Sequence, residues 1–134
     1  MTLVIDASVA LKWLYPEEGS DRAAALLTQR LLAPDLLVVE CSNVIWKLRR
    51  RGDLSGDEAM MAADTLSRSG VELAPMRGLI SEALAIAIAL DHAVYDCIYL
   101  ALARLSGCPM VTADLRLANK LALTPQPGIQ VQLL

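Results

Sequence analysis

The sequence has few of the residues that would mark a secreted or zinc-binding protein. It contains three cysteines, none of them in a CxxC pair, and a single histidine, His92. An odd number of cysteines without that spacing argues against a disulfide framework and against a zinc site. We therefore expect the protein to work in a reducing interior, the cytoplasm.

Long apolar runs are also missing, although 55% of the residues are hydrophobic. The longest run, residues 83–90, is far shorter than the roughly 18 residues that span a bilayer. The start of the chain, MTLVIDAS, has no basic residue and reaches Asp6 at once, which does not fit a signal peptide. The chain of 134 residues therefore predicts one domain, 1–134, with a sizeable core and no membrane partner.

An excess of positive charge is absent as well, since the net charge is −3. Proteins that bind nucleic acids are usually basic. The charge of the whole chain therefore does not favour an RNA or DNA partner. Any such partner has to be argued from local features of the sequence.

Hydrophobic periodicity predicts strands that alternate with helices along the chain. Short apolar runs indicate strands, and amphipathic segments with capping residues indicate helices. This alternation predicts an α/β layer fold around a central, mainly parallel sheet of four to five strands. The expected strands are 2–6, 33–40, 71–75, 109–114 and 128–134, and the expected helices are 7–19, 19–32, 40–52, 55–70, 80–92, 94–107 and 115–123.

Four acidic residues fall at positions that such a fold brings to one edge of the sheet. Asp6, Glu40 and Asp114 each end a predicted strand, and Asp96 begins the predicted helix 94–107. Right-handed connections place the start of that helix at the same edge, where ligands bind in these folds. Four carboxylates would repel one another there, and a hard cation, Mg²⁺ (or Mn²⁺), would relieve the repulsion. The alternative for Asp96 is an N-terminal helix cap.

At these residues the chain resembles a known family. Four segments, VIDASVALKWL, VVECSNVIWKL, VYDCIYLALAR and VTADLRL, are similar in order and spacing to the four acidic motifs of PIN-domain ribonucleases. The chain looks most like the VapC-type toxins of bacterial and archaeal toxin–antitoxin pairs, over nearly its whole length. The resemblance implies a PIN-like three-layer α/β/α fold, metal-dependent endonucleolytic cleavage of RNA, a cognate antitoxin protein as partner and a homodimer.

The resemblance also implies roles for individual residues. Asp6 and Asp96 match the most direct metal ligands, and Glu40 and Asp114 complete the catalytic pocket, partly through water. Accessory polar positions of the family are matched by Ser8, Asn43 and Thr112.

The chemistry expected from this resemblance is attack by water. The chain has no histidine pair, which disfavours acid–base catalysis through the RNA 2′-OH, and His92 is expected to be a surface turn residue. Water attack would leave 5′-phosphate and 3′-OH ends. Leu115 and Arg116 stand where many relatives of the family carry a further acid, and this departure leaves the number of metals, one or two, open.

The helix expected after Glu40 carries positive charge along one side. Glu40, Asn43, Lys47 and Arg50 follow 3-4-3 spacing, which is one stripe of a helix, opposite its apolar face. We call Lys47, Arg50 and Arg51 the basic track. RNA phosphates could follow it, an acidic antitoxin segment could occupy it, or it is simply a solvated helix face.

Three further side chains have alternative interpretations. Lys12 follows Ser8 by four residues and could offset the acids or touch a phosphate, or it could lie along apolar surface with its charge in water. Trp13 and Trp46 could stack on bases, but their apolar neighbours favour packing in a core or an interface.

Two other classes of function stay open at this point. One is a different Mg²⁺-dependent phosphoryl-transfer protein. A receiver domain needs adjacent acids after the first strand, where VIDAS has one, and a haloacid-dehalogenase-type phosphatase needs an acid in place of Ser8. The other is a non-catalytic PIN-like module that binds a partner, against which stands the presence of all four acids.

Overall fold

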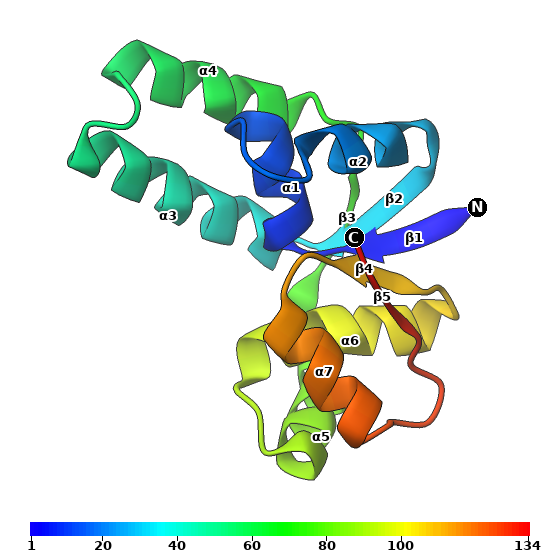
Figure 1. Cartoon of the computed structure of the whole chain (residues 1–134). Coiled ribbons are helices and arrows are strands. Elements are labelled where there is room, and N and C mark those ends of the chain that lie inside the picture. Colours follow the sequence, from blue (N-terminus) through cyan, green and yellow to red (C-terminus); the bar gives the residue numbers. More distant parts are fainter.

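The computed structural model describes all residues, 1–134, and is built on one parallel sheet (Figure 1). The strand order is β3-β2-β1-β4-β5, so the first strand of the chain lies in the middle. The register pairs Leu3 with Leu31 and Val4 with Met110. The strands are β1 (Thr2–Ile5), β2 (Arg30–Pro34), β3 (Glu72–Ala74), β4 (Met110–Thr112) and β5 (Val131–Leu133).

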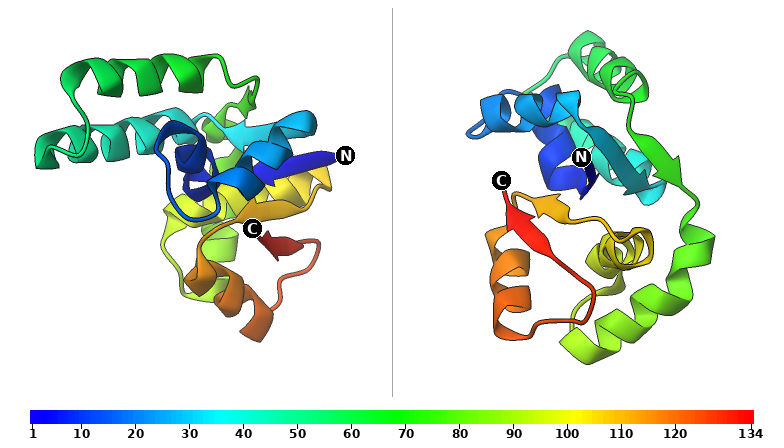
Figure 2. Two further views of the ribbon diagram at one scale, coloured as in Figure 1. Left: turned by 45° about the horizontal axis from the view of Figure 1, so that its top comes forward. Right: turned by 90° about the vertical axis from the view of Figure 1, so that its right-hand side faces the viewer.

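Helices cover both faces of the sheet and complete three layers (Figures 1 and 2). One face carries α1 (Ala7–Leu14), α2 (Ser20–Ala25), α3 (Leu36–Arg51) and α4 (Gly56–Ser67), and the other carries α5 (Ile80–Leu90), α6 (Val94–Ser106) and α7 (Leu115–Leu123). Single 3₁₀ turns lie at η1 (Leu26–Thr28) and η2 (Met76–Leu79). The predicted three-layer α/β/α fold with a parallel sheet is confirmed, and the sheet has five strands.

The core is centred on α6, which packs beneath β1, β2 and β4. Residues 97–103 of this helix are all buried, in one cluster with Leu3, Val4 and Ile5 of β1 and Val9 of α1. This placement explains why the sequence of α6 has almost no polar face.

No single helix has the length and apolar character to cross a bilayer. The segments Met76–Leu90 and Val94–Ser106 reach that length and apolar character only when they are taken together, and the pair is bent by 115°.

Two predicted elements are wrong, and both errors lie around β2. The predicted helix 19–32 ends early at Ala25, and the predicted strand 33–40 belongs mostly to α3. The run of β-branched and leucine residues before Glu40 favours a strand by propensity, but its burial follows helical spacing, which decides the outcome. The residues of α3 that face the core are Leu37, Cys41, Ile45 and Leu48, whereas Val38 and Val39 are exposed.

Candidate active site

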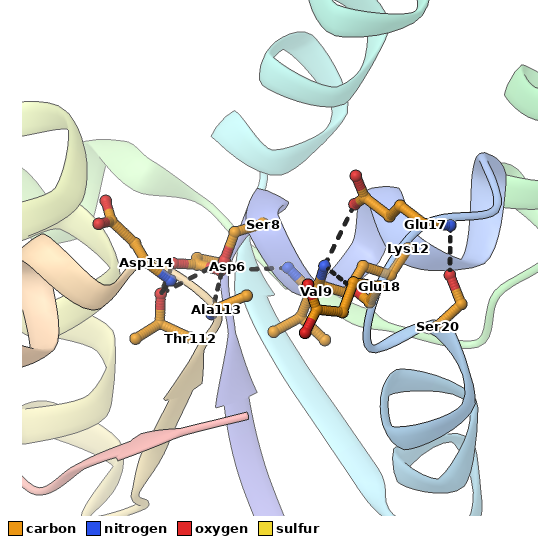
Figure 3. Close-up of polar contacts among 10 residues, drawn as sticks. All are labelled: Asp6, Ser8, Val9, Lys12, Glu17, Glu18, Ser20, Thr112, Ala113 and Asp114. Atoms are coloured by element: carbon orange, nitrogen blue, oxygen red, sulfur yellow. Dashed lines mark hydrogen bonds and ion pairs between the residues drawn. The ribbon is translucent and has the colours of Figure 1, made fainter.

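Asp6 lies between β1 and α1, at the carboxyl edge of the central strand (Figure 3). Its side chain is 5% exposed. The Ser8 hydroxyl donates to Oδ1 and the Thr112 hydroxyl donates to Oδ2, each at 2.5 Å. The backbone N–H of Val9 donates to Oδ1 at 3.3 Å, so Asp6 is also the N-cap of α1. Three donors on one carboxylate make its burial possible.

The same two hydroxyls join the ends of β1 and β4. Ser8 Oγ accepts the N–H of Ala113 at 2.8 Å, and Thr112 Oγ1 accepts the N–H of Asp114 at 3.0 Å. The Asp114 carboxylate caps α7 by accepting two backbone N–H groups in its first turn. In Figure 3 this carboxylate points away from Asp6. Asp114 therefore borders the edge at which Asp6 lies without contacting it.

Asp96 lies in the first turn of α6 and is paired with a histidine. The N-cap of that helix is Ala93, which makes no side-chain bond, so the cap alternative for Asp96 is wrong. Asp96 Oδ2 lies 2.7 Å from His92 Nε2. The imidazole is partly buried, with 18% of the side chain exposed. His92 lies in the connection between α5 and α6, as expected, but its side chain is partly buried and paired with Asp96.

Glu40 lies in the second turn of α3, facing α6. Its Oε1 accepts the hydroxyl of Tyr99 at 2.5 Å. Tyr99 and His92 were not singled out from the sequence as site residues. A signal was available for Tyr99, because it follows Asp96 by three residues in the predicted helix 94–107, which places both polar groups on one stripe of an otherwise apolar segment.

The charge of Asp96 influences the ionisation of Asp6 and of Glu40, and we call these three residues the acidic cluster. Burial raises the pKa of Asp6 to about 6; its hydrogen bonds oppose the rise, and the charge of Asp96 adds to it. Burial likewise raises the pKa of Glu40, against the hydrogen bond from Tyr99 and with a contribution from Asp96. The fold thus brings three of the four predicted acids together, with Asp114 at the border.

The donor set of this cluster suits Mg²⁺ or Mn²⁺. Both cations prefer carboxylate oxygens, and the hydrogen bonds to Glu40, Asp96 and Asp114 occupy only one oxygen of each. No group of three or more His, Cys, Asp and Glu side chains forms a ready-made ion site. Mg²⁺ keeps several waters and needs only one or two direct carboxylates. A cation would also offset the repulsion within the cluster.

The other predicted polar residues lie apart from this cluster. Lys12 donates to the Glu17 carboxylate at 3.4 Å and to the Glu18 carbonyl at 2.5 Å (Figure 3). Of the alternatives for Lys12, pairing with the acids is not what the structure shows, because the loop after α1 supplies its partners. A contact of Lys12 with a phosphate stays a prediction. Asn43 lies one turn beyond Glu40 on α3 and is exposed.

The basic track occupies the far half of α3. Lys47 and Arg50 are exposed, and the Arg50 guanidinium lies 5.4 Å from the ring centroid of Trp46. Arg51 forms an exposed ion pair of 2.8 Å with the loop that follows. Arg50 is about 15 Å along the helix from Glu40 at a rise of about 1.5 Å per residue. The track therefore leads away from the acidic cluster.

The two tryptophans have different surroundings. Trp13 packs against the core, and its Nε1 donates to the Ala23 carbonyl at 2.8 Å. Trp46 is 53% exposed and lines a hollow of about 540 Å³ between α3 and α4. Packing in the core is confirmed for Trp13 and wrong for Trp46, whose packing in an interface stays a prediction.

Comparison with known proteins identifies the class of protein that this fold and site define. The PIN domain family model matches residues 3–121. The chain therefore belongs to the PIN domain family.

Within that family, the chain is similar over most of its length to proteins named VapC ribonucleases. It is 36% identical to Ribonuclease VapC3 of Pyrobaculum aerophilum over 124 residues, which cover 90% of this chain and 95% of the relative. It is 34% identical to Ribonuclease VapC9 of Mycobacterium tuberculosis over 117 residues, which cover 87% and 89%. The resemblance to VapC-type PIN-domain ribonucleases is confirmed.

Solved structures share the fold. PAE2754 from Pyrobaculum aerophilum covers 98% of this chain and 89% of its own, with a TM-score of 0.70 and 23% identity. VapC20 of Mycobacterium tuberculosis covers 87% and 93%, with a TM-score of 0.68 and 16% identity. VapBC2 from Rickettsia felis, solved with a promoter DNA fragment, covers 100% and 99%, with a TM-score of 0.66 and 10% identity. At these identities the likeness shows the fold alone.

Proposed function

We propose that the chain is a Mg²⁺- or Mn²⁺-dependent endoribonuclease of the cytoplasm, the toxin of a type II toxin–antitoxin pair. The observation that carries the proposal is the convergence of Asp6, Glu40 and Asp96 at the carboxyl edge of β1, where Asp96 raises the pKa of the other two. The names of the VapC ribonuclease relatives support the same reaction. The three cysteines of this chain are free thiols, which fits a reducing cytoplasm.

In this proposal, Asp6 and Asp96 hold the cation directly, and Glu40 and Asp114 complete its surroundings, partly through water. When bound, the cation polarises the scissile phosphate and lowers the pKa of an attacking water. The products would be a 5′-phosphate and a 3′-OH.

The neighbouring side chains fix the positions of these acids. The Ser8 and Thr112 hydroxyls hold both oxygens of Asp6, and His92 holds one oxygen of Asp96. Groups oriented in advance of the reaction need little reorganisation in the transition state.

The proposal is tested by incubating purified protein, free of antitoxin, with total bacterial RNA and Mn²⁺ or Mg²⁺, and sequencing the new 5′-phosphate ends. Discrete ends that disappear with EDTA would support the nuclease and identify its target. Folded protein that produces no new ends would favour the non-catalytic partner-binding module.

We place the antitoxin on the α3–α4 hairpin. The hollow there is lined by the exposed Trp46 and Met60 together with Arg49 and Asp57, an apolar surface bordered by charged side chains. Exposed apolar patches of this kind mark protein interaction sites, where tryptophan and arginine are enriched.

A homodimer is the second assembly that we propose. Ile80, Leu84 and Ile88 are exposed at four-residue intervals along α5, which gives one apolar stripe on the face away from the hairpin. Sedimentation velocity of the chain alone tests this proposal, and a monomer at all concentrations would contradict it.

Reversal of charge on the basic track is expected to weaken binding. The double variant Lys47→Glu/Arg50→Glu should reduce affinity for RNA or for the antitoxin by about tenfold or more, because close like charges replace attractive ones. Fluorescence anisotropy with labelled RNA and with the labelled antitoxin measures both affinities. The loss of affinity for RNA should become smaller at high salt.

The matched control is Arg30→Glu/Arg68→Glu, which changes the net charge equally. Arg30 is the first residue of β2, so it lies at the amino end of the strand, away from the acidic cluster. Arg68 is the C-cap of α4. Equal losses from both double variants would mean that net charge, and not the track, is responsible. Unchanged affinity for both ligands in the track variant would reject the track as a binding surface.

A further inference from the structure

Tyr99 joins the core to the acidic cluster. Its side chain is 1% exposed, and it sits in the middle of α6 among consecutive buried residues. From that position its hydroxyl donates to Glu40 Oε1 at 2.5 Å, which connects α6 to α3. A tyrosine has only two rotatable side-chain bonds, so packing of the ring fixes the hydroxyl oxygen in space.

The partner of this hydroxyl is unusual for a core side chain. A buried Tyr or Trp needs a hydrogen-bond partner, and a backbone carbonyl is enough, as the Ala23 carbonyl is for Trp13. Tyr99 uses a half-buried carboxylate instead. The bond takes one oxygen of Glu40, and the second oxygen, Oε2, has no partner within the chain.

Tyr99 and Asp96 also lie on the same stripe of α6, three residues apart. The helix therefore carries one acid of the cluster directly and holds a second acid through a hydroxyl.

We propose that Tyr99 is a positioning residue, which fixes the carboxylate of Glu40 beside Asp96 so that its free oxygen serves a divalent cation. This assignment rests on the proposed function, since it assumes that the acidic cluster takes a cation. Tyr99 itself touches neither cation nor RNA. Loss of partners that orient metal ligands typically lowers metal affinity or activity about 10- to 100-fold.

Tyr99→Phe tests the assignment, because it removes one oxygen and keeps the ring that fills the core. Mn²⁺ affinity, measured from the EPR signal of free Mn²⁺, should fall about 10- to 100-fold. RNA cleavage at limiting Mn²⁺ should fall by a similar factor. Excess Mn²⁺ should restore much of the cleavage in Tyr99→Phe, a recovery that damage to the core alone would not show.

Two controls isolate the path through Glu40. In a Glu40→Gln background, adding Tyr99→Phe should change Mn²⁺ affinity less than twofold, because the carboxylate to be positioned is already gone. Tyr15→Phe removes a hydroxyl that makes no side-chain hydrogen bond and should leave Mn²⁺ affinity and cleavage unchanged. Circular dichroism and thermal unfolding confirm that each variant is folded.

Either of two results would overturn the assignment while the proposed function stands. One is a folded Tyr99→Phe with the Mn²⁺ affinity and cleavage of wild type. The other is a full additional loss from Tyr99→Phe in the Glu40→Gln background. Wild-type protein that neither binds Mn²⁺ nor cleaves RNA would instead overturn the proposed function, and this assignment with it.

Discussion

Asp96→Asn is expected to lower RNA cleavage about 100-fold or more while the chain stays folded. The amide keeps an oxygen and a size that fit the place beside His92, 2.7 Å from the present carboxylate oxygen, but it has no charge for a cation. Asp96 also raises the pKa of Asp6 and Glu40, so its neutralisation removes the group through which the acidic cluster is coupled. Cleavage rates and unfolding curves of the same preparation measure both effects.

Asp64→Asn is the matched control for this change. Asp64 is exposed on α4 and paired with Arg68, and the same atoms are exchanged. An exposed ion pair of this type contributes little to stability, so cleavage should match wild type. If folded Asp96→Asn cuts RNA as fast as Asp64→Asn does, Asp96 is not part of the site.

The second large effect is a fall in stability as pH rises through the titration of Asp6. Its pKa is about 6 in the fold and 3.8 as a free side chain. Between these values the folded state binds more protons than the unfolded state, so the free energy of unfolding decreases with pH. At about 1.4 kcal/mol per pKa unit, the loss from pH 3.8 to 6 is about 3 kcal/mol. Urea unfolding in EDTA at several pH values measures it.

Asp6→Asn separates this effect from the other titrating groups. The neutral amide resembles the protonated acid, so the variant should lose much less stability than wild type across the same pH range. At pH 7 it should therefore be more stable than wild type although it no longer cleaves RNA. If the free energy of unfolding changed with pH in the same way for both proteins, the pKa of Asp6 would not be raised in the fold.

Much of the fold follows from periodicity alone. The helix at Leu115–Leu123 and the strand at Met110–Thr112 have clear apolar spacing and clear ends, and the structure has both where they were expected. Asp6 and Asp114 were predicted at one edge of a parallel sheet because each ends a strand, and Asp96 was predicted there by the connection rules; the structure has all three at that edge. Asp6 and Asp114 come after short strands and Asp96 begins a regular helix, and in these elements local pattern and packing agree.

Glu40 lies at the predicted edge of the sheet, but on a different element from the one predicted. It was expected at the end of a strand, and it lies on a helix that begins at Leu36. Four consecutive apolar residues before an acid fit either element, and only the contacts of α3 with the rest of the fold decide between them. The acid was placed at the correct edge because both elements begin or end there.

The hydrogen-bond partners of the acids were the least predictable part of the site. Tyr99 and Glu40 are 59 residues apart, and Thr112 and Asp6 are 106 apart. Spacing within one segment says nothing about such pairs, which exist only when distant elements pack. The resemblance pointed to Thr112 and Ser8, whereas Tyr99 required the structure.

The central position of β1 has a consequence for when a growing chain becomes active. β1 is made first, but one of its two neighbours, β4, is made near the end of the chain. Until Thr112 has been synthesised, Asp6 lacks one of its two hydroxyl partners, and the sheet is open on that side. Long-range strand pairing of this kind forms late in folding. A ribosome that stalls earlier holds a chain that carries Asp6, Glu40 and even Asp96, yet has no complete site with which to cut the RNA around it.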